Sequence, residues 1–195
     1  MIDWDFTGLH DEEIESFVRA IGEGDDLRWR FGERSLNFIV RNCVRLAQIG
    51  ELEKSWLTTY VFTSHFQDVG FDRLKAIFDA CDRSRLQAHH DCVPVAEGLS
   101  TERISLFRGC AGPVHTPGMS WTTSLDKAIY YAKWHADLHL ELGQPAEMAV
   151  YATTVDLREI YCRVNRNEDE FIVVPDNLWR IDIPETEFRL DRPRY

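Results

Sequence analysis

Apolar residues in the first 85 positions recur with the period of an α-helix. Four stripes follow the i, i+3, i+4 type of spacing, which places side chains on one helix face. Their apolar residues are Ile14, Phe17, Val18 and Ile21; Leu36, Ile39, Val40 and Cys43; Leu52, Trp56, Tyr60 and Val61; and Leu74, Ile77, Phe78 and Cys81. Such stripes are typical of the helix surfaces that face a core. The pattern therefore predicts a helical N-terminal region.

The ends of these helices are predicted from capping residues. Gly22 and Gly50 are expected to end the first two helices, because glycine readily adopts the left-handed conformation found at a helix C-terminus. Ser35 is expected to cap the second helix, since a serine hydroxyl accepts a hydrogen bond from a backbone N–H of the first turn. The third helix is expected to end near Gly70.

After residue 100 the pattern changes to short alternating or apolar segments bounded by turn residues. The predicted strands are RISLFRG, which stops at Gly109, then SWTT, MAVYATTVDL, FIVV and LWRIDI. Ser124 is expected to cap a helix that begins after the second strand and carries Ala128 and Ala132 on one face. The chain is thus predicted to be α+β, with a helical region at 1–100 packed on a β-rich core at 101–195.

Composition narrows the classes of protein that fit this pattern. The chain has 195 residues and carries 22 basic against 33 acidic side chains, a net charge of −11, which disfavours docking on a nucleic-acid backbone. No apolar run approaches the roughly 20 residues that cross a bilayer. The N-terminus MIDWDFTGLHDEE lacks the features of a secretory signal. Five scattered cysteines favour reduced thiols, so we expect a cytoplasmic protein, with leaderless export or delivery into a host cell left open.

Three polar signals lie at predicted strand ends in the second half. Arg108 ends the first strand, Ser120 opens the second, and Glu168 and Glu170 open FIVV. Taken singly, each has an ordinary explanation. An arginine at a strand end usually forms a surface ion pair, a serine there is usually a turn residue, and acidic residues before a strand usually protect an edge.

Taken in order, the motifs LFRG, SWT and EDE resemble the ADP-ribosyltransferase superfamily, in its arginine–serine–glutamate branch. That branch has an Arg at the end of its first core strand, a Ser-x-Ser/Thr motif on a second strand and a Glu-x-Glu motif that enters a later strand. The resemblance covers about residues 103–183, and it implies an ADP-ribosyltransferase-type β-core. The implied enzyme is a mono-ADP-ribosyltransferase that cleaves the nicotinamide–ribose bond of NAD, with NAD as substrate and no metal.

The resemblance also implies roles for individual residues around NAD. Glu170 would stabilise the positive charge that develops on the ribose, as carboxylates do in glycoside chemistry. Ser120 would orient Glu170, and Arg108 would hold the phosphate–ribose part through its forked guanidinium. Gly109 would let the backbone approach the nicotinamide amide. Thr122 completes the second motif and is counted among the NAD-binding residues.

The resemblance also implies an acceptor. In this family, a carboxylate two positions before the catalytic one, here Glu168, accompanies transfer to arginine side chains. A strand would place it on the same side as Glu170 and turn Asp169 away as a solvated spacer. Tyr161 is the aromatic residue expected to meet the acceptor. Arg163 and Arg166 add local positive charge in the same segment, with a solvated loop as the plain interpretation. A protein acceptor is favoured over nucleic acid.

Other interpretations remain open from the sequence. An NAD glycohydrolase would use the same site with water as the acceptor, and a non-catalytic interaction module would use the helical region to bind a partner. That region would otherwise dock the target or cover the cleft. Zinc at AHHDC is disfavoured by its spacing, and a Cys110–His115 nucleophile pair is disfavoured because no residue is identified to orient the histidine. The family includes toxins, phage enzymes and host regulators, and neither this context nor the oligomeric state follows from the sequence.

Overall fold

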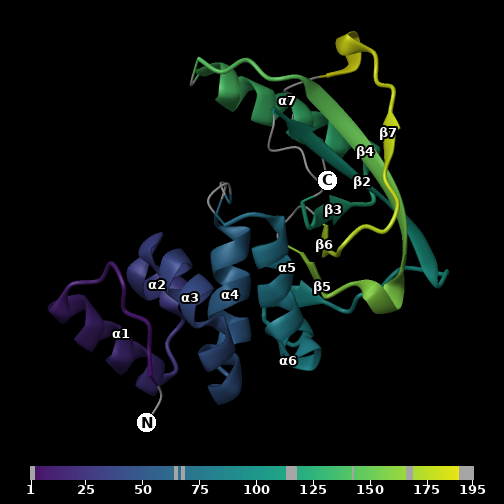
Figure 1. Cartoon of the computed structure of the whole chain (residues 1–195). Helices are drawn as coiled ribbons and strands as arrows, with labels where there is room; N and C mark the ends of the chain where they lie inside the picture. Colours follow the sequence, from purple (N-terminus) through teal and green to yellow (C-terminus); the bar gives the residue numbers. More distant parts are fainter. Residues whose placement is uncertain are drawn as a thin grey trace. The chain divides into compact units, whose positions relative to one another are not determined.

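The computed structural model of the chain describes residues 3–63, 66, 69–112, 118–141, 143–165 and 169–188 (Figure 1). The chain divides into two compact units, Met1–His89 and His90–Tyr195. The predicted boundary was at residue 100. Residues 92–93 instead belong with the sheet, because they form a strand that pairs with Val164 and Arg163.

The N-terminal unit is helical, as predicted. Its helices in the described residues are α1 (Asp11–Glu23), α2 (Leu27–Phe31), α3 (Arg34–Ile49), α4 (Leu52–Val61), α5 (Phe71–Ala80) and α6 (Arg83–Gln87). The four predicted helices are present, whereas α2 and α6 were missed because five residues are too few to show a helical period. Both short helices begin after an aspartate cap, with Asp26 accepting from Arg28 N and Asp82 accepting from Arg85 N.

Several predicted helix ends were wrong by a few residues. Helix α1 runs past Gly22 and ends at Gly24, which has a φ of +67°. Gly50 ends α3 as predicted, with a φ of +76°, but the N-cap of α3 is Glu33. Ser35 lies inside the helix, where its hydroxyl donates to the Gly32 carbonyl at 2.6 Å. Helix α4 ends at Val61, well before Gly70.

The apolar stripes of the N-terminal unit form its core. Phe17 is fully buried and stacks on Phe31 at a centroid distance of 3.7 Å, and Phe38 lies 4.6 Å from it. Trp56 and Phe78, also fully buried, make an edge contact at 5.4 Å. These aromatic contacts join helices distant in sequence, and each aromatic side chain contributes a large buried apolar area.

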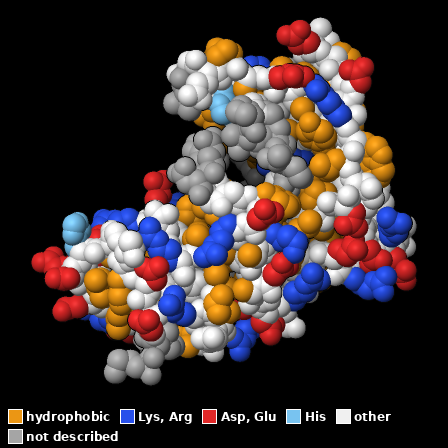
Figure 2. All heavy atoms as spheres, viewed as in Figure 1, with side chains coloured by type: hydrophobic (Ala, Val, Ile, Leu, Met, Phe, Trp, Pro, Cys, Tyr) orange, Lys and Arg blue, Asp and Glu red, His pale blue; other side chains and the backbone are white. Residues whose placement is uncertain are grey.

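Charged side chains of both signs are scattered over the face of this unit seen in Figure 2, with apolar side chains between them. Arg34, for example, pairs with Glu13. The face in view therefore carries no continuous basic surface of the kind that binds a nucleic-acid backbone. No helix in the described ranges is both long enough and apolar enough to cross a membrane.

The C-terminal unit is built on a seven-stranded sheet with helix α7 (Leu125–Glu141) and two short 3₁₀ segments, Leu157–Glu159 and Glu185–Glu187. The strands run in the order β1-β5-β6-β3-β2-β4-β7, and each described pair of neighbours is antiparallel. Their bounds are β1 (Cys92–Val93), β2 (Arg103–Ala111), β3 (Ser120–Thr122), β4 (Met148–Asp156), β5 (Cys162–Val164), β6 (Glu170–Ile172) and β7 (Trp179–Ile181). The predicted α+β class is confirmed at this level.

Two strand limits differ from the prediction. Strand β2 continues past Gly109 to Ala111, because these residues keep pairing with Val150 through Met148 of β4. Strand β6 begins at Glu170 itself and ends at Ile172, after which Val173 N still donates to the Met119 carbonyl at 2.9 Å. Glu170 is therefore the first residue of the strand, as predicted, whereas the strand ends two residues before Val174.

The two faces of the sheet carry different layers. One face holds an apolar cluster that includes Leu106, Trp121 and Phe171. The other face is covered at β2 and β4 by α7, whose Ala128 and Ala132 cluster with Val150. Helix α7 begins as predicted, with the Ser124 hydroxyl accepting from Lys127 N at 3.3 Å.

Gly109 is the point where α7 comes closest to β2. A Cβ atom at Gly109 would overlap the carbonyl group of Ala128 and lie 2.6 Å from the amide nitrogen of Ala132. The missing side chain thus makes room for the helix backbone, and Gly109 is buried. This packing gives a structural reason for the glycine, and its expected role at the nicotinamide amide stays a prediction.

We predict that Gly109→Ala will destabilise the fold by at least about 3 kcal/mol, the upper range for overpacking, because the obstructing atoms are backbone. Urea unfolding followed by circular dichroism measures the change. Gly22→Ala is the control, since Gly22 lies in α1 with nothing within 4 Å of its added Cβ. The control should be neutral or stabilising by up to about 1 kcal/mol, and equal effects at the two glycines would contradict the packing role.

Candidate functional site

The predicted site residues lie on three strands that are neighbours in the sheet. Arg108 belongs to β2, Ser120 opens β3 and Glu170 opens β6, and the sheet order places β3 between β2 and β6. The register pairs Phe107 with Thr122, and Thr122 with Glu170. Segments about 60 residues apart in the chain are thus joined by two steps of cross-strand pairing.

Ser120, Thr122 and Glu170 share one side of the sheet. Side chains alternate along a strand, so Ser120 and Thr122 point the same way, and Glu170 lies directly opposite Thr122. Directly opposed residues have Cβ atoms about 4.5–5.5 Å apart. Thr122, rather than Ser120, is therefore the direct cross-strand neighbour of the Glu170 carboxylate, which is half-buried.

Thr122 also fixes the entry to α7. Its hydroxyl oxygen accepts a hydrogen bond from Ser124 N at 3.2 Å, and the side chain is 9% exposed. A hydroxyl that accepts one hydrogen bond can still donate another. Thr122 therefore offers a donor beside Glu170 while its own rotamer is held by the turn into the helix.

Arg108 lies on the opposite side of β2 from Phe107, which packs with α7. Because Phe107 is paired with Thr122, the Arg108 side chain leaves the sheet on the opposite face from Ser120, Thr122 and Glu170. Its Nη1 donates to the backbone carbonyl of Ser120 at 2.8 Å, so the side chain reaches across to the first residue of β3. Its Nε is buried and has no hydrogen-bond partner among the described residues. An unpaired buried N–H is costly, on the order of 1–3 kcal/mol, so a ligand oxygen that accepted from this donor would be favoured.

Gly118 allows the chain to pass against this arginine. A Cβ at Gly118 would lie 2.9 Å from Arg108 Nε and overlap Nη2 and Cζ of the guanidinium group. The Gly118 carbonyl accepts from Trp121 Nε1 at 2.8 Å, which ties the approach to β3 to the apolar face of the sheet. Gly118 was not among the site residues predicted from the sequence.

Asp169 is not the solvated spacer that the sequence predicted. It has a φ of +52°, in the left-handed region that a non-glycine residue seldom adopts. Its carboxylate accepts from Arg163 Nε at 2.6 Å and from the Thr123 hydroxyl at 3.3 Å. The prediction assumed that the strand already includes residue 169, whereas the strand begins one residue later.

Arg163 is likewise held, rather than solvated. Its side chain is 15% exposed, and its guanidinium carbon lies 4.9 Å from the ring centroid of Phe171. Nη1 donates to the Glu97 carbonyl at 2.5 Å. Together with Asp169, this arginine fixes the backbone immediately before Glu170, which gives the carboxylate a rigid mount.

The remaining predicted residues have different outcomes. Tyr161 is only 5% exposed, so little of its ring is left to meet a macromolecule. Its backbone N donates to the Ile172 carbonyl at 2.8 Å, which joins it to β6. Glu168, Arg166 and His115 lie outside the described residues. Cys110 is buried, and burial raises the pKa of its thiol, which opposes a role as a thiolate nucleophile.

The AHHDC segment brings three metal-type ligand atoms together. Those of His89, His90 and Asp91 lie within 4.8 Å of one another. These residues are consecutive, so their closeness follows from chain connectivity, and structural zinc is almost always bound by four ligands. We assign no metal to them.

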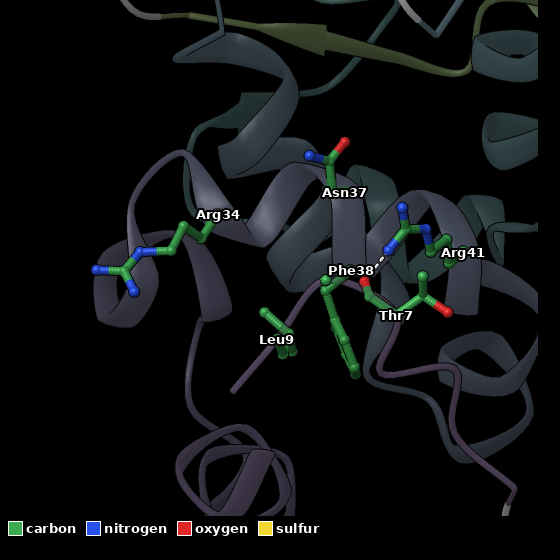
Figure 3. Close-up of a pocket in the computed structure, with 7 residues that line it drawn as sticks. Thr7, Leu9, Arg34, Asn37, Phe38 and Arg41 are labelled. Carbon is green, nitrogen blue, oxygen red and sulfur yellow. Dashed lines mark hydrogen bonds between the residues drawn. The ribbon is translucent and has the colours of Figure 1, made fainter. Parts of the chain in front are cut away.

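A pocket of about 120 Å³ lies in the N-terminal unit, between α3 and the segment before α1 (Figure 3). Arg41 donates to the Thr7 carbonyl at its rim, and Phe38 and Leu9 supply apolar walls. Ligand pockets for molecules of drug size usually measure about 300–1,000 Å³. This pocket is too small for a dinucleotide, and it contains none of the predicted site residues.

Comparison of the chain with protein-family models, curated proteins and solved structures found no match.

We predict that Asp169→Asn will lower the free energy of unfolding by about 1–2 kcal/mol, because it removes one partner of a partly buried, charge-assisted hydrogen bond. Asparagine tolerates a positive φ, so backbone strain does not confound the result. Asp176→Asn is the control, since Asp176 is exposed and should change the stability by less than about 0.5 kcal/mol. If both substitutions are equally mild in urea unfolding, Asp169 is a solvated spacer after all.

Proposed function

We propose that the protein is an NAD-dependent mono-ADP-ribosyltransferase, which cleaves the nicotinamide–ribose bond and transfers ADP-ribose to a macromolecule. The observation that carries the proposal is the adjacency of β2, β3 and β6, which bear Arg108, Ser120 and Glu170 in the order typical of this superfamily. A chance set of three short motifs would have no reason to fall on consecutive neighbouring strands.

Glu170 is the proposed catalytic carboxylate. Departure of nicotinamide leaves positive charge on the ribose, and a carboxylate fixed beside the sugar stabilises that charge without reorganising. The rigid mount supports this role, since Asp169 and Arg163 hold the preceding backbone and Thr122 lies directly opposite. The Thr122 hydroxyl orients the carboxylate, and Ser120, two positions along the same side, contacts the ribose.

Arg108 has two proposed tasks. One guanidinium nitrogen already holds the Ser120 carbonyl, so it positions β3. The buried Nε, which has no partner in the described part of the chain, is the donor proposed for an oxygen of the dinucleotide. Because Arg108 and Glu170 leave opposite faces of the sheet, the dinucleotide would have to reach around the short strand β3 to meet both. A guanidinium suits this division because its five donors point in fixed directions.

The acceptor is proposed to be a protein arginine, with Glu168 orienting the guanidinium. An NAD glycohydrolase is the second candidate, and the burial of Tyr161 favours it, because the aromatic residue expected to meet a macromolecule is 5% exposed. Both candidates share the first chemical step and differ only in what attacks the ribose.

We predict that Glu170→Gln will reduce NAD cleavage by at least about 100-fold, the scale of losing one preorganised electrostatic contact in a transition state. Release of nicotinamide from NAD measures the rate. Glu102→Gln is the control, because Glu102 is an exposed carboxylate of the same unit and should leave the rate unchanged. A wild-type protein that neither binds nor cleaves NAD would favour a non-catalytic interaction module and defeat the proposal.

We predict that Glu168→Gln will abolish transfer while sparing hydrolysis, because Glu168 acts on the acceptor and not on the ribose. NAD labelled in its adenylate part is incubated with cell lysate, and label in macromolecules is compared with free ADP-ribose. Transfer by the wild type, with only free ADP-ribose from the variant, is the expected result. If the wild type itself gives only free ADP-ribose, the glycohydrolase is the correct function.

A further inference from the structure

Cys92 and Cys162 form a pair on neighbouring strands at one edge of the sheet. In the β1–β5 register Cys92 is opposite Val164, and Cys162 lies two positions along β5 from Val164. Because side chains alternate along a strand, both cysteines project from the same side. A hydrogen bond joins the two side chains.

The two thiols differ in access. Cys92 is half-buried and can meet a small solute, whereas Cys162 is fully buried. The hydrogen bond from Cys162 lowers the pKa of Cys92, and it outweighs burial and the nearby Asp91 carboxylate, which both raise it. Cys81 and Cys110 differ from Cys92, since burial raises the pKa of each. A thiolate is the nucleophilic form, so Cys92 has the properties of a reactive cysteine.

We propose that Cys92 and Cys162 are a reversible oxidation site that reacts with hydrogen peroxide to form an intramolecular disulfide. The Cys92 sulfur attacks one peroxide oxygen, the O–O bond breaks, and the products are a sulfenic acid and one water. The Cys162 sulfur then attacks the Cys92 sulfur and expels the hydroxyl group as a second water. Two thiols thus lose two electrons and two protons, and one peroxide is reduced to two waters.

The strand geometry makes this disulfide a strained one. Diagonal neighbours on antiparallel strands have Cα atoms about 7–8 Å apart, whereas disulfides usually join Cα atoms about 4.4–6.8 Å apart. Bridging therefore requires β1 to shift toward β5. Strand β1 is short, with two residues at the end of the strand order, so few pairings oppose the shift. Strained disulfides are easily reduced, which makes the site reversible.

The test treats the full-length reduced protein with hydrogen peroxide, blocks remaining thiols with an alkylating agent and identifies peptides by mass spectrometry. The expected product is a peptide cross-linked through Cys92 and Cys162, which dithiothreitol converts back to two thiols. Cys110→Ser is the matched control and should keep the cross-link. Cys92→Ser should leave Cys162 reduced, because the buried thiol is not reached by peroxide.

A further variant separates pair chemistry from simple exposure. In Cys162→Ala the resolving thiol is absent, so Cys92 should accumulate as sulfenic acid, trapped by dimedone, and proceed to sulfinic acid. In the wild type the dimedone adduct should be largely lost to the disulfide. The proposal is overturned if wild-type Cys92 gives sulfinic acid without the cross-link, if it forms only intermolecular disulfides, or if both thiols survive peroxide.

Discussion

The close approach of α7 to β2 at Gly109 is the constraint on which the C-terminal unit depends. A side chain at this position would meet helix backbone, which cannot rotate away as a side-chain tip can. Because α7 follows β3 directly, its position on β2 also determines where β3 lies. The Thr122 hydroxyl and the Ser124 cap fasten that junction. Arg108 can then reach the Ser120 carbonyl, and β6 adds its Glu170 opposite Thr122.

The same unit contains partly buried charged side chains, which lower the stability of the fold unless they have hydrogen-bond partners. Arg163 is satisfied by the Asp169 carboxylate, the Glu97 carbonyl and the face of the Phe171 ring. This contact holds Asp169 at a positive φ, which non-glycine residues seldom adopt. Arg108 differs, because one of its buried donors lacks a partner in the described part of the chain. A satisfied pair next to the proposed carboxylate and an unsatisfied donor two strands away fit a site that is rigid before its ligand arrives.

The motifs were readable from the sequence, and so was the type of each long element, because hydrophobic periodicity depends on local spacing alone. Four helices of the N-terminal unit, α7 and five of the strands followed from it, whereas the short strands β1 and β5 were not predicted. Five-residue helices are too short to show a period, so α2 and α6 were missed. Helix ends were displaced where a second glycine or serine nearby offered an equally good local signal, as Gly22 did before Gly24 and Ser35 did after Glu33.

The sequence by itself determined which residues carry candidate chemistry and in what order, since Arg108, Ser120 and Glu170 are recognisable without any coordinates. Only the tertiary structure decided what surrounds them. The roles of Gly109, Gly118 and Asp169 depend on contacts with segments as distant as α7 and β5, and no local pattern encodes those contacts. Because β6 starts at Glu170, Asp169 lies just outside the strand and is a half-buried partner of Arg163 rather than a solvated spacer, and this register is fixed by pairing across the sheet.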